Sequence, residues 1–313
     1  AEVTSERSDF RDEARRGPIA LVPEMANAQH YEVPAEFFAQ VLGTHRKYSA
    51  CFWAPDVRNL DEAEAASLRI TCERADLRDG MRILELGCGW GSLSLWMASQ
   101  YPKSRIVSIS NSAAQRAHIV AEARRRGLGN LEIRTLDMNA FEPFETFDRV
   151  VSVEMFEHMR NWEALLGRIE KCLAPEGRVF LHVFCHRFAT CPCVTDGPED
   201  WLGRHFFTGG MMPSRDYLRH LDIPLEVEAE WTWSGDHYRR TAEAWVANLD
   251  RHRAEVLRIL ADTYGPAAAR RWYGRWRIFF LACAEMFGLR AGNEWLVVHH
   301  RLQRRDASPQ SEG

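Results

Sequence analysis

The 313-residue sequence predicts an α/β fold, in which helices cover both faces of a parallel sheet and a helical cap is added to it. Two observations indicate the sheet. Short apolar stretches alternate with helical ones between residues 82 and 184, and the first of them runs into the segment Gly87-Cys88-Gly89-Trp90-Gly91. The cap is indicated by residues 239–261 and 266–287, where apolar side chains recur at helical intervals outside that alternation.

The individual elements follow from capping residues and apolar periodicity. The helix before the sheet is expected to begin at Asn59, because Asn59 and Glu62 have the spacing of a capping box, and to continue through Cys72 and Leu77. Strands are expected at residues 82–86, 105–109, 131–136, 147–153, 178–184, 225–233 and 295–302. Further helices are expected at 92–100, 112–126, 161–173, 239–261 and 266–287, with a loop-like region at 185–224.

This pattern divides the chain into five parts. Residues 1–58 are expected to form an N-terminal helical arm or cap, and residues 59–184 the α/β core. Residues 185–290 are expected to form a substrate cap made of an insertion and helices, and residues 291–303 the final core strand. The polar residues 304–313 are predicted to be a disordered tail.

Net charge and hydropathy narrow the classes of partner. The chain has 40 Lys and Arg against 44 Asp and Glu, a net charge of −4, whereas a dedicated nucleic-acid binder normally carries a basic excess. No apolar run approaches the roughly 18 residues that cross a bilayer, and the charged first residues do not resemble a leader peptide. We therefore expect a cytoplasmic protein with no nucleic-acid partner and no stable membrane association, and we leave a homodimer open.

The eight cysteines lack the regular spacing of a disulfide scaffold. The densest group of metal-ligating residue types comprises His182, Cys185, His186, Cys191 and Cys193. No Cys-x-x-Cys pair recurs at a second site, as a structural zinc site would need. The prediction is reduced, mostly buried thiols and no metal.

The segment from Glu85 to Gly91 has the residues of a ligand-binding turn. Its glycines permit a sharp turn and a close approach of the backbone to a ligand, and free amides at the next helix favour an anionic group. The spacing is Gly-x-Gly-x-Gly, which differs from the dinucleotide fingerprint, and Glu85 precedes Gly87 by two positions. This form resembles the S-adenosylmethionine site of class I methyltransferases.

Longer stretches narrow the resemblance to one family. Three segments are similar to cyclopropane-fatty-acid-synthase-like methyltransferases: Tyr48-Ser49-Ala50-Cys51-Phe52-Trp53, Val151-Ser152-Val153-Glu154-Met155-Phe156-Glu157-His158-Met159 and Tyr238-Arg239-Arg240-Thr241-Ala242-Glu243-Ala244-Trp245. Residues 72–75, 89–95, 154–159, 184–186, 206–210 and 212–214 look closest to the plant coclaurine N-methyltransferases. The likeness runs from about Tyr48 to Leu302. It implies a Rossmann-like class I methyltransferase sheet, S-adenosyl-L-methionine as cofactor, and a small aromatic or heterocyclic, benzylisoquinoline-like amine as acceptor.

The resemblance also implies which residues form the site. The cofactor would contact Tyr48, Ser49, Glu85, Gly87, Gly89, Asn111, Gln115, Asp137 and Met138. Within this set, Tyr48 and Ser49 would meet the methionine part, and Asp137 with Met138 would flank the adenine. Asn111 and Gln115 would reach the ribose and amino-acid portion. The catalytic candidates are Glu154, Glu157 and His158 after the fourth strand, with His182 and Tyr238 as polar residues lining the same pocket.

Methyl transfer from a sulfonium is an in-line displacement, so orientation supplies much of the acceleration. An amine acceptor must be neutral when it attacks, and Glu157 or His158 could take its proton. Glu154 could hold an ammonium substrate. An alternative interpretation of both carboxylates is helix N-terminal capping, where acids are favoured anyway. Aromatic candidates for the pocket wall are Trp162, Trp201, Phe206, Phe207, Trp231, Trp233 and Phe287, each of which could equally be core.

Three other functions compete with amine methylation. The first is a cyclopropane-synthase-type enzyme acting on unsaturated acyl lipids. Such enzymes resemble one another in a cysteine directly after a Tyr-Ser pair, which is part of a bicarbonate site. This chain has Ala50 at that position. Those enzymes also tend to carry glycine where this chain has Glu154. A non-catalytic interaction protein is disfavoured by the intact glycine turn with Glu157, His158 and Tyr238. Nucleic-acid methylation is disfavoured because no Asn-Pro-Pro-Tyr motif occurs.

Overall fold

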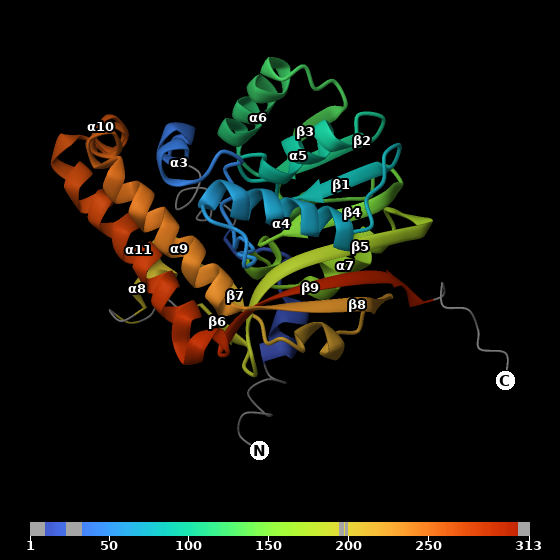
Figure 1. The fold of residues 1–313 in the computed structure, drawn as a ribbon. Coiled ribbons are helices and arrows are strands. Elements are labelled where there is room, and N and C mark those ends of the chain that lie inside the picture. The colour runs from blue at the N-terminus through green and yellow to red at the C-terminus, as the bar shows by residue number, and fades with distance from the viewer. Residues whose placement is uncertain (1–9, 23–32, 194–196, 198–199, 306–313) are drawn as a thin grey trace.

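A seven-stranded sheet forms the centre of the computed structural model, which describes residues 10–22, 33–193, 197 and 200–305 (Figure 1). Its strands are β1 (Arg82–Leu86), β2 (Arg105–Ser110), β3 (Leu131–Thr135), β4 (Phe147–Val153), β5 (Leu173–His186), β8 (Leu225–Ser234) and β9 (Trp295–Arg304). They lie in the order β3-β2-β1-β4-β5-β9-β8. Strands β1 to β5 are parallel, and β9 is antiparallel to both its neighbours. The predicted α/β class and parallel core are confirmed.

Helices pack on both faces of the sheet. Successive side chains of a strand point to opposite faces, so neighbouring residues of β1 belong to different clusters. Ile83 of β1 packs against α4 (Leu60–Arg74) and α5 (Ser92–Gln100), in a cluster that includes Leu68 and Leu93. The next residue, Leu84, belongs to the cluster on the other face, with Trp162 of α7 (Trp162–Glu170). Helix α6 (Ala113–Arg125) covers β2 and β3.

The cap is a group of four helices beside the sheet: α3 (Ala35–Val41), α9 (Gly235–Arg251), α10 (Arg253–Tyr264) and α11 (Pro266–Gly292) (Figure 1). Their shared core contains Phe37, Phe38, Trp245, Leu249, Leu260, Trp276 and Phe280. Trp90, Trp233 and Val297 belong to the same cluster, so the cap packs directly on the turn after β1 and on β8 and β9. This packing fixes the cap relative to the sheet.

Several predicted elements differ in the structure. The single helix expected at 239–261 is two helices, α9 and α10, because the backbone of His252 leaves helical geometry at φ −98° and ψ 22°. The helix expected at 161–173 ends at Glu170, since Leu173 already pairs with Phe147 and begins β5. The region 185–224 is not all loop. It contains β6 (Cys191–Pro192), α8 (Trp201–Phe206), β7 (Met211–Met212) and a 3₁₀ helix, η4 (Tyr217–His220), all too short to give a periodic signal.

The five-part division of the chain stays a prediction. Strand β8 falls within residues 185–290 and yet lies in the central sheet, so that segment is more than a cap. Residues 10–16 and α3 are helical in the expected arm. The expected tail begins inside β9, which ends at Arg304, and residues 306–313 lie outside the described residues.

The cysteines and helices bear on two further expectations. All eight thiols are free, and six of them are buried. Across the described ranges, no three His, Cys, Asp or Glu side chains are grouped so that they could hold a metal ion. Within the same ranges no helix combines the length and apolar character needed to span a membrane.

We predict that Phe280→Ala destabilises the protein by about 3–5 kcal/mol, because the fully buried ring at the centre of the cap core would leave a cavity. Ile278→Ala, on the same helix but 55% exposed, is the matched control and should change stability by no more than about 0.5 kcal/mol. Chemical denaturation of both variants measures the difference. Equal losses would contradict a cap core centred on Phe280.

Candidate active site

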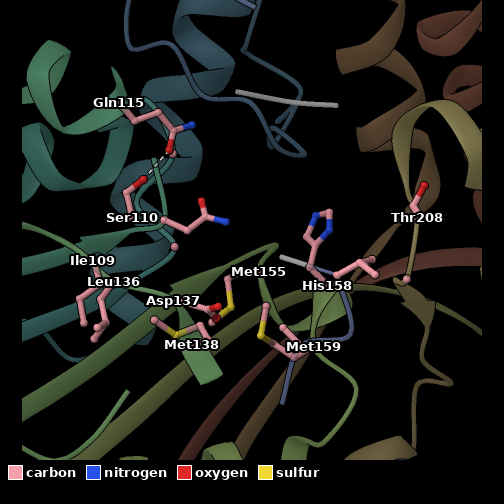
Figure 2. Close-up of a pocket in the computed structure, with 16 residues that line it drawn as sticks. Ile109, Ser110, Gln115, Leu136, Asp137, Met138, Met155, His158, Met159 and Thr208 are labelled. Atoms are coloured by element: carbon pink, nitrogen blue, oxygen red, sulfur yellow. Dashed lines mark hydrogen bonds between the residues drawn. The ribbon is translucent and has the colours of Figure 1, made fainter. Parts of the chain in front are cut away.

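A cavity of about 660 Å³ lies at the carboxyl ends of the parallel strands (Figure 2). The predicted cofactor residues that line it are Gly87, Gly89, Asn111, Gln115, Asp137 and Met138. They follow β1, β2 and β3, whose carboxyl ends meet at one edge of the sheet. Figure 2 shows Ser110 and Gln115 on one side of this cavity, with His158 and Thr208 across from them. The first cavity therefore gathers two thirds of the predicted cofactor residues.

Gln115 presents a buried donor to this space. Its Oε1 accepts a hydrogen bond from the hydroxyl of Ser110 at 2.6 Å, whereas its Nε2 has no partner among the described residues (Figure 2). The hydroxyl of Ser92 and the indole N–H of Trp90, which line the adjoining cavity, are buried and unpartnered in the same way. A buried donor without an acceptor costs about 1–3 kcal/mol. These three groups therefore fit a ligand rich in acceptors, such as a carboxylate or a ribose.

The glycines of the turn after β1 shape the wall between ligand and protein. Gly87 has φ +80°, and a Cβ there would lie 2.5 Å from Cγ of Met155. Gly89 has φ +51°, and a Cβ there would meet no atom within 4 Å. A side chain at Gly89 would thus project into open space beside the cavity. Both positions need glycine, the first for close approach and the second for backbone conformation and free volume.

A second cavity of about 1430 Å³ adjoins the first, and Gly87, Gly89, Gln115 and His158 line both. Its aromatic wall consists of Tyr48, Trp90, Phe184, Phe207, Tyr238, Trp245, Phe279 and Phe287. Of the aromatic residues proposed from sequence, only Phe207 and Phe287 belong to this wall. Trp162 and Phe206, for example, are buried in the apolar cores. Tyr48, Ser49 and Glu85, the remaining predicted cofactor residues, line this second cavity.

Glu154 places a carboxylate in the wall of the second cavity. It follows β4 directly and has a left-handed φ of 47°, unusual for a residue other than glycine. Its Oε1 accepts hydrogen bonds from the amide of Ala50 at 2.9 Å and from Nε2 of His182 at 3.1 Å. Its Oε2 accepts one from the hydroxyl of Tyr238 at 2.8 Å. Three donors, from three different parts of the chain, thus converge on this side chain.

His182 and Tyr238 are donors to that carboxylate in their neutral forms. Burial raises the pKa of Tyr238 well above its usual value, so the phenol keeps its proton. Burial lowers the pKa of His182 to about 4, which makes the imidazole neutral near pH 7. Tyr238 lines the second cavity as predicted. His182 is fully buried behind Glu154 and is not among the residues that line either cavity.

Glu157 and His158 are neighbours in a 3₁₀ turn, η3 (Phe156–His158), but face different environments. Glu157 is fully buried and accepts a hydrogen bond from the amide of Phe184 at 2.7 Å. Burial, reinforced by the charge of Glu154, raises the pKa of Glu157 well above its usual range. Neither cavity is lined by Glu157. His158 lines both cavities and contacts Phe207, with ring centroids 4.5 Å apart.

Sequence reasoning missed several polar groups of the site. Ser92 follows the glycine segment directly, so its position could have suggested it. Lys47 is buried and donates hydrogen bonds at 2.6 Å to the hydroxyl of Ser49 and to the carbonyl of Ala50. His299 on β9 contacts His182. Nothing in the sequence pairs residues 182 and 299, because only the strand order brings them together.

The chain is similar to known proteins over most of its length. The family model described as mycolic acid cyclopropane synthetase matches residues 22–296. The chain is 36% identical over 289 residues to (S)-coclaurine N-methyltransferase of Thalictrum flavum subsp. glaucum, covering 91% of this chain and 80% of that protein. It is 31% identical over 276 residues to cyclopropane-fatty-acyl-phospholipid synthase of Escherichia coli strain K12, covering 87% and 67%.

A solved structure of coclaurine N-methyltransferase bound to N-methylheliamine and SAH superimposes with a TM-score of 0.93 at 34% identity. The match covers 97% of this chain and 88% of that one. The superposition therefore includes the sheet and the cap.

The buried carboxyl of Glu85 provides a pH-dependent test of the site. It accepts hydrogen bonds from the hydroxyls of Ser94 and Ser108, yet burial raises its pKa from 4.5 to about 7. A raised pKa in the folded state contributes stability below pH 4.5 that is lost as the pH rises to about 7. We predict that Glu85→Gln, which cannot ionise, gains about 3 kcal/mol relative to the parent protein over that window.

Chemical unfolding at pH 4.5 and at pH 8 would measure this gain, because the two pH values bracket the range in which Glu85 titrates. Glu142→Gln, the same change at a side chain that is 69% exposed, is the control. A difference between Glu85→Gln and the parent that is constant with pH would contradict a titrating Glu85.

Proposed function

Since the chain belongs to the mycolic acid cyclopropane synthetase family, we propose that it is an S-adenosylmethionine-dependent N-methyltransferase acting on a small aromatic or heterocyclic amine. The observation that carries this proposal is the carboxylate of Glu154, held by three donors in the wall of a cavity that eight aromatic residues also line. A fixed negative charge among aromatic rings suits a cationic, ring-bearing acceptor. The second cavity thus has the chemistry of an amine site.

The residues of the first cavity fit the cofactor. Asp137 and Met138 would flank the adenine, and Asn111 would reach the ribose. The unpartnered Nε2 of Gln115, which lines both cavities, and the hydroxyl of Ser92 in the adjoining second cavity would donate hydrogen bonds to the amino-acid portion. When bound, the cofactor supplies a sulfonium methyl as electrophile. His158, which lines both cavities, marks the passage where that methyl and the acceptor nitrogen would meet.

Of the two candidate bases, Glu157 and His158, only His158 is suitably placed to take the proton of the acceptor. Glu157 is fully buried and lines neither cavity, so it is not placed to take a proton from an amine there. His158 is in place to accept it directly or through a water molecule. Glu154 already accepts three hydrogen bonds, and its role is to attract the ammonium and to stabilise the positive charge that moves to the nitrogen. Enclosure by the aromatic wall orients the acceptor for in-line attack.

Acyl-lipid modification is the competing activity, because the family and the apolar second cavity are compatible with it. In this chain, however, the amide of Ala50, His182 and Tyr238 already bind the carboxylate of Glu154. A bicarbonate ion placed there would find these three donors already bound to Glu154. The cytoplasmic location and the homodimer stay predictions.

The proposal predicts label transfer from methyl-labelled S-adenosylmethionine to amines, such as tetrahydroisoquinolines, and not to unsaturated phospholipid vesicles offered beside them. His158→Ala should lower kcat by about 10²–10⁴-fold near pH 7, because the acceptor loses its base. The loss should shrink at a pH above the pKa of the acceptor, where the amine is already neutral. Glu157→Gln, which keeps the shape of a protonated carboxyl, should cost less than His158→Ala.

Each alternative result of this assay has a definite meaning. Label in the vesicles alone would replace amine methylation by lipid modification. A Glu157→Gln loss as large as that of His158→Ala, recovered at high pH, would assign the base to Glu157.

We further predict that Gln115→Ala weakens binding of S-adenosylhomocysteine about tenfold, because one hydrogen bond of its buried Nε2 is lost. Isothermal titration calorimetry measures the change. Gln303→Ala is the control, since the Nε2 of Gln303 on β9 already donates to Glu226 on β8 at 2.8 Å. An unchanged affinity in Gln115→Ala would show that this amide does not meet the cofactor.

A further inference from the structure

Behind the second cavity, a row of polar side chains crosses the sheet and ends at Glu154. Nη1 of Arg74, the last residue of α4, lies 2.9 Å from Nδ1 of His299 on β9. Nε2 of His299 lies 2.9 Å from Nδ1 of His182 on β5. Nε2 of His182 lies 3.1 Å from Oε1 of Glu154. We call Arg74, His299, His182 and Glu154 the relay.

The sheet holds the middle of the relay in register. His182 and His299 are direct partners in the pairing of β5 with β9, and both are fully buried. The ring of Trp233 on β8 packs on both imidazoles, with centroid distances of 4.4 Å to His299 and 5.3 Å to His182. The guanidinium of Arg74 lies 5.1 Å from the ring centroid of Trp231. Each member is thus fixed by packing as well as by hydrogen bonds.

The relay has a fixed direction because arginine can only donate. Nδ1 of His299 must accept from Arg74, so the proton of this neutral imidazole is on Nε2. That proton points at Nδ1 of His182, which must accept it, and His182 therefore carries its own proton on Nε2. Burial keeps the pKa values of both histidines low, which is consistent with one proton on each ring. The Nε2–H of His182 then donates to Glu154.

We propose that Arg74 and His299 are positioning residues, which fix the tautomer of His182 so that its Nε2–H always points at the carboxylate of Glu154. Without them, only the carboxylate of Glu154 would favour the proton on Nε2, and His182 could also carry it on Nδ1 with a lone pair facing Oε1. That tautomer would remove one of the three donors to the carboxylate that a cationic acceptor needs. The inference rests on the proposed function for its consequence in catalysis, but the tautomer itself is independent of the substrate.

Two substitutions of His299 separate a relay from mere packing. In His299→Gln, Oε1 can accept from Arg74 and Nε2 can donate to His182, so the direction of the relay is kept. In His299→Leu the volume is largely retained but both hydrogen bonds are lost. Arg74→Met breaks the relay at its partly exposed end and serves as the second variant if His299→Leu does not fold.

The first measurement is ¹⁵N NMR of the histidine rings in the full-length protein, which distinguishes the two neutral tautomers. We expect His182 to be protonated at Nε2 in the parent and in His299→Gln. We expect a mixture of tautomers in His299→Leu and in Arg74→Met. An unchanged tautomer in both breaking variants would overturn the proposal.

The second measurement is the KM for the amine in the methyl-transfer assay. It should rise about tenfold in His299→Leu, the effect of one lost hydrogen bond to a charged group, and by less than about threefold in His299→Gln. His299→Gln as impaired as His299→Leu would also overturn the proposal. If no amine is methylated by the parent protein, the proposed function fails, and the tautomer measurement alone decides between a relay and packing.

Discussion

The hydrogen bonds to the carboxylate of Glu154 tie together three parts of this protein that are distant in sequence. Ala50 lies in the segment between α3 and α4, His182 in the sheet and Tyr238 in the cap, and each donates to the same side chain. A charge removed from water is tolerated only when donors surround it. This segment, the sheet and the cap must therefore pack around Glu154 together, and the same packing encloses the second cavity.

Glu154 and Glu157 are three residues apart but lie in different environments. Glu154 accepts hydrogen bonds from three groups and lines a cavity, whereas Glu157 is fully buried and accepts one from the amide of Phe184. Burial and the neighbouring charge of Glu154 raise the pKa of Glu157. Under the proposed function, this difference leaves proton transfer to His158, at the passage between the cavities.

The cap and the sheet contribute different properties to the site. The strand ends and the glycine turn build a cavity from short, rigid connections, which is typical of a cofactor site in α/β proteins. The second cavity takes most of its aromatic wall from α9, α11 and the segment around Phe207. Under the proposed function, the cap would supply most of the aromatic surroundings of the acceptor, whereas Glu154 and six of the nine residues proposed for the cofactor lie at the strand ends of the sheet.

The parallel core could be predicted from the sequence, because local periodicity locates strand ends well: the predicted strand at 147–153 coincides with β4. The residues proposed for the cofactor and the motif around Glu154 could be predicted with it, since most of them adjoin such an end. Lys47 and His299 were missed, because no strand-end signal points to them. The break at His252 and the short helix α8 were missed as well, since tertiary contacts rather than periodicity decide them.

Only the tertiary structure decided which side chains face the cavities. Glu157 and His158 are adjacent in one motif, and the turn of η3 sends the first into the core and the second into the site. The pairing of His182 with His299 arises from the antiparallel insertion of β9 beside β5, a contact between residues 117 positions apart. No local pattern encodes such a pairing, because strand order is a property of the whole packed sheet.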